Sequence, residues 1–236
     1  MPHSSQHPSM DDLRAAVDAF AGQRVLIWGD FVADRFLHGS TTRVSREAPA
    51  LVLKYEHEEI RPGGAGNAAL NAAALGARVA VVGFVGNDGV GAALRDALAS
   101  AGVDVTALEQ RGDHPTPVKT RVMAGGSHTV RQQILRIDHE DPWPDTDSAH
   151  PAVATLGRSA DFDAVMISDY GLGTVDTAVA ARWLDGEPGL PVLLDSRHRL
   201  LDFPGVTAAT PNEEEAEMAS GTRLGDDLDA VEAAGA

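Results

Sequence analysis

Short apolar segments with strand character alternate with segments of helical spacing along most of this 236-residue chain. Repeated alternation of this kind predicts a parallel sheet whose connecting helices cover both of its faces. The strands are expected at 24–28, 78–84, 103–107, 164–168, 192–195 and 206–209. The helices are expected at 11–20, 66–75, 89–101, 149–158, 175–184 and 213–220, with one more beginning at 226.

Two further regions, 36–56 and 116–138, are rich in β-forming residues but do not follow this alternation. In the first region, alternating apolar positions and the interruption at Pro49 predict short strands with one side in contact with water. The pair Gly125-Gly126 divides the second region into a hairpin that leaves the main sheet. We expect the two regions to pair with each other as a small β lid.

The composition excludes several classes of partner. Nineteen Lys and Arg against 35 Asp and Glu give a net charge of −16, and such a field repels nucleic acid and anionic lipid headgroups. An anionic small substrate remains compatible, because its binding depends on the local cations of one pocket. The chain has no cysteine, which suits a reducing interior. No apolar run approaches the ~18 to 20 residues that span a bilayer, so we expect a cytoplasmic protein that binds neither nucleic acid nor membranes.

The run Arg61-Pro-Gly-Gly-Ala-Gly-Asn67 places three glycines where a helix is expected to begin. Glycine lets a ligand approach the backbone closely, and the first turn of a helix offers free N–H groups. Asn67 lies in this turn, and its amide can both donate to and accept from hydroxyl groups. Asn71 shares the same helix face. Because a buried asparagine without a ligand is costly, we expect a binding role for Asn67, with a purely structural role as the alternative.

Five polar residues follow the ends of predicted strands, where ligands gather in open parallel sheets. Helix capping or turn formation explains any one of them taken alone, but their accumulation on one rim favours a pocket. A carboxylate after the first strand could accept two sugar hydroxyls, with a salt bridge to Arg35 as the alternative. The five residues are Asp30, Asp34, Asp169, Asp195 and Asn212.

Two further pairs of residues point to an anion and a metal ion. Lys119 and Arg121 alternate along a strand and therefore point to the same side, where two cations attract an anion; a solvated strand face is the alternative. Asn212 and Glu215 begin a glutamate-rich helix, and their oxygens are ligands of the kind that Mg²⁺ takes. An ordinary surface helix with acidic residues at its positive dipole end is the alternative for this second pair.

Taken together, five motifs resemble those of the ribokinase-like, or PfkB-type, carbohydrate kinases over residues 24–220. They are Gly29-Asp-Phe-Val-Ala-Asp34, Pro62-Gly-Gly-Ala-Gly-Asn67, Val82-Gly-Phe-Val-Gly-Asn-Asp88, Ser168-Asp-Tyr170 and Thr210-Pro-Asn-Glu-Glu-Glu215. Within that family, the chain is most similar to the D-glycero-D-manno-heptose 7-phosphate kinases. The segments that carry this similarity are Arg43-Val-Ser-Arg-Glu-Ala-Pro49, Leu135-Arg-Ile-Asp138 and Ser168-Asp-Tyr170.

The resemblance implies an α/β sandwich with a β lid, ATP and Mg²⁺ as cofactors, and a specific reaction. That reaction is transfer of the γ-phosphoryl group to the anomeric hydroxyl of a phosphorylated heptose, driven mainly by positioning and charge neutralisation. The implied sugar-binding residues are Asp34, Gly64, Asn67 and Arg136, with Lys119 and Arg121 as candidates for the sugar's phosphate. The implied nucleotide-binding residues are Asp195, Asn212 and Glu215, of which Glu215 is the expected metal ligand.

Three features depart from the family pattern. The G-A-G-D motif, whose glycines form an anion hole and whose aspartate is the catalytic base, has no counterpart up to Ala236. We therefore expect residues 23–236 to form an incomplete kinase domain behind an N-terminal extension of 1–22, without an assigned catalytic base and inactive alone. Leu172 stands where the heptose kinases usually have a lysine, and Arg197 replaces another lysine, which keeps the charge but alters its geometry.

Two alternative functions remain open at this point. One is a non-catalytic protein that binds sugar phosphates, and the other is a kinase of the same fold that acts on another sugar or on a nucleoside. In all three cases the expected partner is a small molecule. The resemblance also implies a homodimer formed through the β lid as a candidate assembly.

Overall fold

The computed structural model describes residues 8–125, 130–144, 159–186, 189–225 and 228–235. Its helices are α1 (Met10–Asp18), α2 (Ala65–Ala74), α3 (Gly89–Ser100), α5 (Thr177–Gly186), α6 (Glu213–Ser220) and α7 (Leu228–Ala234), with 3-10 turns η1 (Ser159–Asp161) and η2 (Leu200–Asp202). Its strands are β1 (Arg24–Gly29), β2 (Phe31–Val44), β3 (Leu51–Gly64), β4 (Arg78–Gly86), β5 (Asp104–Arg111), β6 (Val118–Gly125), β7 (Gln132–His139), β8 (Ala164–Asp169), β9 (Val192–Ser196) and β10 (Ala208–Ala209). The helix expected at 149–158 lies outside the described residues. None of the described helices has the length and apolar character needed to cross a membrane.

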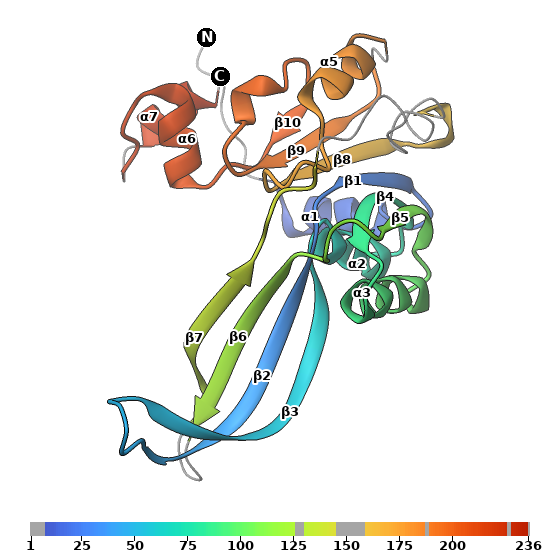
Figure 1. Ribbon diagram of the computed structural model, residues 1–236. Coiled ribbons are helices and arrows are strands. Elements are labelled where there is room, and N and C mark those ends of the chain that lie inside the picture. The colour runs from blue at the N-terminus through green and yellow to red at the C-terminus, as the bar shows by residue number, and fades with distance from the viewer. Residues whose placement is uncertain (1–7, 126–129, 145–158, 187–188, 226–227, 236) are drawn as a thin grey trace.

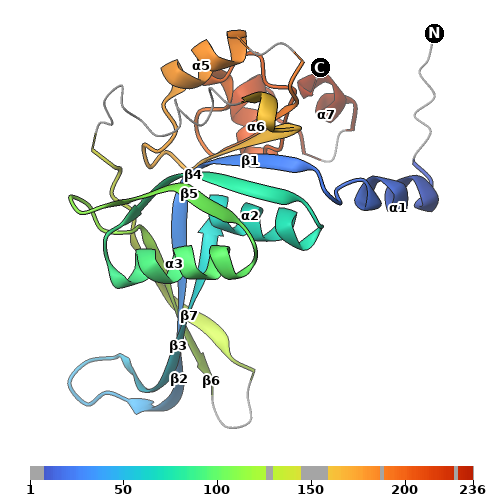
Figure 2. The ribbon, with the colours of Figure 1, turned by 90° about the vertical axis from the view of Figure 1, so that its right-hand side faces the viewer.

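Six parallel strands form the central sheet, in the order β10-β9-β8-β1-β4-β5. Figures 1 and 2 show α2 and α3 on one side of this sheet and α5 and α6 on the other. The predicted α/β architecture is therefore confirmed. Strand β10 is shorter than expected, because it pairs with β9 only through Ala208 and Ala209.

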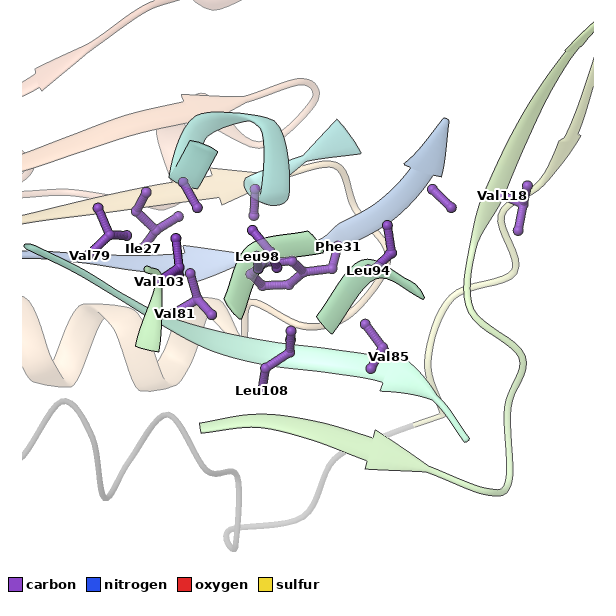
Figure 3. Packing of buried hydrophobic residues seen from close by; sticks show 13 residues of the cluster. Ile27, Phe31, Val79, Val81, Val85, Leu94, Leu98, Val103, Leu108 and Val118 are labelled. Carbon is purple, nitrogen blue, oxygen red and sulfur yellow. The ribbon is translucent and has the colours of Figure 1, made fainter. Parts of the chain in front are cut away.

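Strand β1 lies in the middle of the sheet and contributes to both hydrophobic cores. Ile27 packs into the cluster shown in Figure 3, which includes Leu98 of α3. Leu26 and Trp28 point the opposite way, into a cluster with Ala180 of α5. The three β1 side chains are fully buried, and burying a side chain of this kind contributes ~1.5–3 kcal/mol. A continuous apolar run therefore suits this strand, because its alternating side chains meet a helical layer on each face.

The remaining four strands form the lid, a second sheet in the order β3-β2-β6-β7. Strands β2 and β6 are parallel, whereas the two outer pairs are antiparallel. Figure 1 shows this sheet standing away from the central domain. The predicted pairing of the two β-rich regions is confirmed, but the expectation of short strands is wrong, since β2 and β3 have 14 residues each. Pro49 lies in the connection between them and interrupts neither strand.

Asp30 is the single residue between β1 of the central sheet and β2 of the lid. Strand β1 ends at Gly29, and β2 begins at Phe31. The sequence had suggested that Asp34 lies in a turn after the first strand. It lies instead within β2. A second connection is made by Asp88, which caps α3 by accepting from the Gly91 N–H at 2.7 Å. The same carboxylate accepts from the Thr116 N–H at 2.8 Å, close to the start of β6.

Candidate functional site

A cavity of about 420 Å³ lies where the lid joins the central domain, between the roots of β2, β3 and β6 and the start of α2. Its volume falls within the range of pockets that bind small molecules. Five of the six predicted sugar- and phosphate-binding residues line it, although they come from four different elements. The lining residues are Val32, Asp34, Phe36, Arg61, Pro62, Gly63, Gly64, Asn67, Lys119, Arg121 and Tyr170.

Asp34 is surrounded by cations in this cavity. In the register of the lid it lies directly opposite Arg61 on β3 and Lys119 on β6. Its carboxylate accepts from Arg121 Nη2 at 2.8 Å, so the ion pair suggested with the neighbouring Arg35 is replaced by one between two strands. The other oxygen, Oδ2, lies against Gly63, where a Cβ atom would be only 2.7 Å away. The absence of a side chain at Gly63 therefore makes room for the carboxylate.

Two guanidinium groups converge on the ring of Phe36. Arg61 Cζ lies 5.4 Å and Arg121 Cζ lies 5.9 Å from the ring centroid. Arg61 makes two contacts with Glu59, at 2.7 and 2.9 Å. Guanidinium groups are suited to binding carboxylates and phosphates through paired hydrogen bonds. Sequence reasoning assigned no role to Arg61, and the signal that could have found it was its position at the start of the glycine motif.

Lys119 lies deeper, at the boundary of the cavity with the central domain. Its Nζ forms an ion pair with Glu140 at 2.8 Å and lies 5.1 Å from the centroid of the Tyr170 ring. The lysine side chain is largely buried. All three cations contact both a carboxylate and an aromatic face, but Lys119 is the least exposed, at 12% against 24% for Arg121 and 62% for Arg61, so it has the least freedom to move.

The start of α2 forms the opposite wall of the cavity. Gly64 adopts a positive φ of 54°, and a Cβ there would lie 2.5 Å from the Asp30 carbonyl oxygen, so only glycine fits this position. Asn67 lies in the first turn of α2 and lines the cavity. Its side chain is exposed, which removes the argument from the cost of burial. Asn71 is also exposed and does not line the cavity.

Arg136 is the predicted sugar-binding residue that does not line the cavity. It lies opposite Arg121 in the register between β6 and β7. Its guanidinium group instead forms an ion pair with Asp138 on the same strand, at 2.7 Å. That ion pair and the neighbouring charges of Glu140 and Asp34 raise the pKa of Arg136.

Asp30 has a structural role that the sequence did not predict. It is fully buried, and its carboxylate accepts hydrogen bonds from the backbone N–H groups of Tyr170, Leu172 and Thr174. Burial raises the pKa of this carboxyl group, and these hydrogen bonds oppose the rise. Asp30 therefore fixes the loop after β8 and does not face the sugar cavity.

Leu172 lies in that loop and belongs to a small apolar cluster with Val32, Phe84 and Trp143. Its carbonyl oxygen accepts from the Trp143 N–H at 2.7 Å. The side chain is buried, so the leucine joins the root of the lid to the loop. A lysine at this position would have to leave the cluster or bury its charge.

A second cavity of about 280 Å³ adjoins the first. Its lining residues are Asp169, Tyr170, Asp195, Arg197, Thr210, Asn212 and Glu215. Tyr170 lines both cavities, so one ring contacts the two spaces. Sequence reasoning quoted Tyr170 in a motif but gave it no function. The three residues predicted to bind the nucleotide and the metal ion all lie in this second cavity.

Asp195 and Arg197 bring opposite charges to the second cavity without forming a direct ion pair. Among the described residues, neither side chain has an ion-pair partner, although both line the same space. Burial raises the pKa of Asp195, and the nearby negative charges of Glu215 and Asp169 raise it further. A cation placed among these carboxylates would relieve their repulsion.

Asn212 and Glu215 cap helix α6 reciprocally. The Asn212 side chain accepts from the Glu215 N–H at 3.0 Å, and Glu215 Oε2 accepts from the Asn212 N–H at 2.9 Å. The capping explanation is therefore correct for both residues. It does not exclude a ligand, because Glu215 Oε1 accepts no hydrogen bond from the described part of the chain.

Asp169, another of the predicted strand-end residues, is neutralised within the protein. Its carboxylate pairs with Arg199 and accepts from Ser196 Oγ at 2.7 Å. It is almost fully buried. Asp169 therefore supports the floor of the second cavity. Within the described ranges, no group of three or more His, Cys, Asp or Glu side chains has the arrangement of a metal site.

Comparisons with known proteins identify the family and the fold of the chain. A model of the pfkB family of carbohydrate kinases matches residues 24–236. Relatives named bifunctional protein HldE are 41% identical over 217 residues in Caulobacter vibrioides and 38% identical over 220 residues in Pseudomonas aeruginosa. The matched regions cover 90% and 93% of this chain but 44% and 45% of those relatives. The chain thus spans less than half the length of these relatives.

Solved structures show the same fold. The Arabidopsis thaliana ribokinase complexed with ribose and ATP has a TM-score of 0.65 at 18% identity, covering 91% of this chain and 68% of that one. The Cryptococcus neoformans ribokinase in complex with ADP has a TM-score of 0.57 at 20% identity, covering 91% and 66%. With a family model that matches nearly the whole chain and a ribokinase-like fold with its β lid, this protein belongs to the pfkB family of carbohydrate kinases.

Proposed function

We propose that this chain is the sugar-kinase part of a protein that phosphorylates the anomeric hydroxyl of D-glycero-D-manno-heptose 7-phosphate. The lid cavity binds the sugar phosphate, and the second cavity binds the phosphates of ATP together with Mg²⁺. The supporting comparison is the identity of about 40% with proteins named HldE. The sequence motifs similar to heptose 7-phosphate kinases support the same substrate.

One observation carries the substrate class. Among the residues that line the lid cavity are three cations, Arg61, Lys119 and Arg121, and one carboxylate, Asp34. The chain as a whole has a net charge of −16. Each cation is paired with a carboxylate, namely Glu59, Glu140 and Asp34, but of these three carboxylates only Asp34 lines the cavity. Guanidinium and ammonium groups that line a cavity in so acidic a protein favour an anionic substrate. The exposed amide of Asn67 and the carboxylate of Asp34 supply hydrogen-bonding groups for hydroxyls, which together with the cations suit a sugar phosphate.

The second cavity fits a nucleotide phosphate chain with a magnesium ion. Mg²⁺ is usually held by one or two carboxylates together with substrate phosphates and waters. Asp195 and Glu215 offer carboxylate oxygens here, and Arg197 offers a positive charge. Glu215 would hold the ion, and Arg197 would contact the phosphates, where a lysine is usual in heptose kinases. ATP supplies the transferable phosphoryl group when it is bound.

The work of these residues is positioning and charge neutralisation, which dominate phosphoryl transfer. The lid cavity orients the sugar, Lys119 places a positive charge beside Tyr170 at the boundary, and the second cavity holds the donor. Because Tyr170 contacts both spaces, acceptor and donor would meet at this residue. No residue of this chain is assigned the role of general base.

The domain assignment and the assembly are part of the same proposal. Residues 23–236 form the kinase region, α1 belongs to an N-terminal extension, and the lid strands cover the sugar. A second copy of the chain pairs with the first through the lid. ATP-dependent phosphorylation of a sugar phosphate places the protein in the cytoplasm.

The test combines a calorimetric panel on this chain with a kinetic assay. Heptose 7-phosphate is expected to bind more tightly than hexose 6-phosphates, nucleosides and unphosphorylated heptose, and ATP is expected to bind only weakly without Mg²⁺. Preference for a nucleoside or for another sugar would reject the heptose assignment. Because this chain is expected to be inactive alone, phosphorylation is measured on the longer protein of which it is proposed to be the kinase part. Binding of the sugar phosphate by that protein without any phosphorylation in the presence of Mg·ATP would instead favour a non-catalytic binding protein.

A further inference from the structure

In the lid cavity, Asp34 and Arg121 form an ion pair that leaves neither charged group free for a ligand. Asp34 is the acidic side chain among the described residues that line the cavity, and the hydroxyl groups of a sugar would need its carboxylate. That carboxylate is bound to Arg121 Nη2 at 2.8 Å. Arg121 is equally the guanidinium group that an anionic ligand would need. The two residues therefore block each other until a ligand separates them.

The contact between them is of a kind that can exchange. A single Nη2–Oδ1 contact joins the two groups, and each side chain is about one-quarter exposed. Ion pairs between partly exposed side chains contribute little stability. A phosphate monoester carries up to two negative charges and can accept paired hydrogen bonds from one guanidinium group. It is therefore a stronger partner for Arg121 than one carboxylate oxygen of Asp34.

Arg61 provides the second half of an anion site. It lies directly opposite Asp34 in the strand register and shares the Phe36 ring with Arg121. Its side chain is 62% exposed, so it can turn toward a ligand without leaving a buried position, and the phosphate would replace its exposed partner Glu59. Lys119 differs from both arginines in its burial, since its side chain is only 12% exposed and pairs with Glu140 at the boundary of the cavity.

We propose that the terminal phosphate of the sugar is bound between Arg121 and Arg61, and that its binding releases Asp34 from Arg121. The freed Asp34 carboxylate then accepts hydrogen bonds from the hydroxyl groups of the same sugar. This inference rests on the proposed function, because it requires a sugar phosphate in the lid cavity. It adds Arg61 as a specificity-determining residue and makes the Asp34–Arg121 ion pair the element that selects phosphorylated sugars.

Discrimination follows directly from the exchange. When a phosphorylated sugar binds, its hydroxyl groups bind the Asp34 carboxylate and its phosphate becomes the new anionic partner of Arg121. An unphosphorylated sugar must compete with Arg121 for Asp34 and leaves the guanidinium group without an anionic partner, with only Gln133 Oε1 at 3.5 Å and the Phe36 ring near it. The ion pair therefore penalises the unphosphorylated sugar specifically. Removing Arg121 should affect the two sugars in opposite directions, which a residue that only holds Asp34 in place would not do.

The experiment measures the dissociation constants of three probes by calorimetry. The probes are heptose 7-phosphate, the same heptose without phosphate, and inorganic phosphate. The proteins are the wild-type chain and its Arg121→Gln, Arg61→Gln and Asp34→Asn variants. The matched control is Glu56→Gln, which removes a lid carboxylate of similar exposure, 32% against 26%, that pairs with Arg131 and does not line the cavity. Thermal melts monitored by circular dichroism verify that each variant is folded.

Arg121→Gln should weaken heptose 7-phosphate binding at least about tenfold and should tighten the binding of unphosphorylated heptose. Arg61→Gln should weaken only the two phosphate-bearing probes. Asp34→Asn should tighten inorganic phosphate by about fivefold, because Arg121 is then free, and should weaken heptose 7-phosphate. Glu56→Gln should leave inorganic phosphate within about twofold of the wild-type value, since a distant exposed charge is screened.

Two outcomes would overturn the exchange. One is an equal loss of both sugars in Arg121→Gln, and the other is no gain in phosphate affinity in Asp34→Asn. If the variants respond to inorganic phosphate as expected but the wild-type chain binds no sugar phosphate, the anion site stands and the proposed function fails. If the wild-type chain binds heptose 7-phosphate but Arg121→Gln weakens both sugars equally, the function stands and the exchange fails.

Discussion

Gly63 shows how a single missing side chain shapes the lid cavity. The carboxylate of Asp34 occupies the space that a Cβ atom at Gly63 would need, at 2.7 Å from Oδ2. The φ of Gly63 is not in the left-handed region, so alanine meets no backbone strain here. The effect of a substitution would therefore come from the displaced carboxylate and from tighter packing against the Val32 carbonyl oxygen.

We predict that Gly63→Ala weakens binding of heptose 7-phosphate about tenfold and costs ~1 kcal/mol of stability. Calorimetry measures the first effect and urea unfolding the second. Gly112→Ala is the control, because a Cβ atom there meets no described atom within 4 Å. Unchanged sugar-phosphate affinity in a folded Gly63→Ala protein would show that the position of Asp34 is not needed for binding.

Asp195 lines the second cavity without an ion-pair partner among the described residues. Its pKa is raised by burial and then by Glu215 and Asp169, so the folded protein holds a proton on it more tightly than the unfolded chain does. The charged form therefore costs stability above the raised pKa, and this cost disappears as the pH falls through that value.

Asp195→Asn should accordingly raise the melting temperature at neutral pH by roughly 1–3 °C, because it removes a repelled charge. If the proposed function is correct, the same change should weaken Mg·ATP binding, since it removes one of the two carboxylates proposed to lie near the metal ion. Scanning calorimetry and titration with Mg·ATP measure the two effects. A lower melting temperature together with unchanged Mg·ATP binding would contradict both parts of the prediction.

At the level of elements, the loop after β8 depends on Asp30. Three backbone N–H groups of this loop donate to one fully buried carboxylate. The loop carries Tyr170, which contacts both cavities. The Asp30 side chain therefore joins the β1–β2 connection to the loop that carries Tyr170.

Asp30→Asn should destabilise the protein by ~2–4 kcal/mol, because an amide has one acceptor oxygen where the carboxylate has two, and its NH₂ group faces N–H donors. Urea unfolding measures the loss. The exposed Asp163, which pairs with Arg24 at the other end of β1, provides a control in which Asp163→Asn should cost much less. Equal losses in the two variants would show that burial of the Asp30 network adds nothing.

The sequence predicted much of the central sheet because its signals are local. Alternation of apolar runs and helical spacing is sufficient to locate β1, β4, β8 and β9, and the lid strands follow from their own pattern. The length of β2 and β3 was missed because Pro49 resembles a strand break unless its place in the connection is known. The burial of Asp30 was missed because its three donors lie about 140 residues away in the chain.

The candidate site was predicted less evenly than the fold. Asp34, Gly64, Asn67, Lys119 and Arg121 are brought together around one cavity, but their roles in binding remain predictions. The sequence did not indicate that Arg136 lies outside this cavity, or that Arg61 and Tyr170 line it. Strand parity tells which face a side chain occupies, but it does not tell which carboxylate on that face will pair with it.

At the scale of the whole molecule, the lid exposes apolar side chains on a sheet that stands away from the central domain (Figure 1). Leu135 on β7 is 53% exposed, and Tyr55 on β3 is 62% exposed. All eight residues of β7 are exposed, so this edge strand is available for contact. Exposed apolar groups on a projecting sheet are typical of protein interfaces.

We predict that the chain dimerises through the lid and that Leu135→Asp converts the dimer to a monomer in sedimentation experiments. Met218→Asp is the matched control, since Met218 on α6 is 61% exposed and does not belong to the lid. The control should sediment as a dimer. A wild-type chain that sediments as a monomer at concentrations of about 100 µM would reject the lid interface.

The single-residue connection between β1 and β2 also determines how the lid can move. Asp30 is anchored on both sides, by its backbone between two strands and by its carboxylate to the loop beyond β8. The connection between β1 and β2 therefore contains no flexible linker that could act as a hinge. A change in the tilt of the lid would therefore require bending within β2, whose fourteen residues pair with β3 on one side and with β6 on the other.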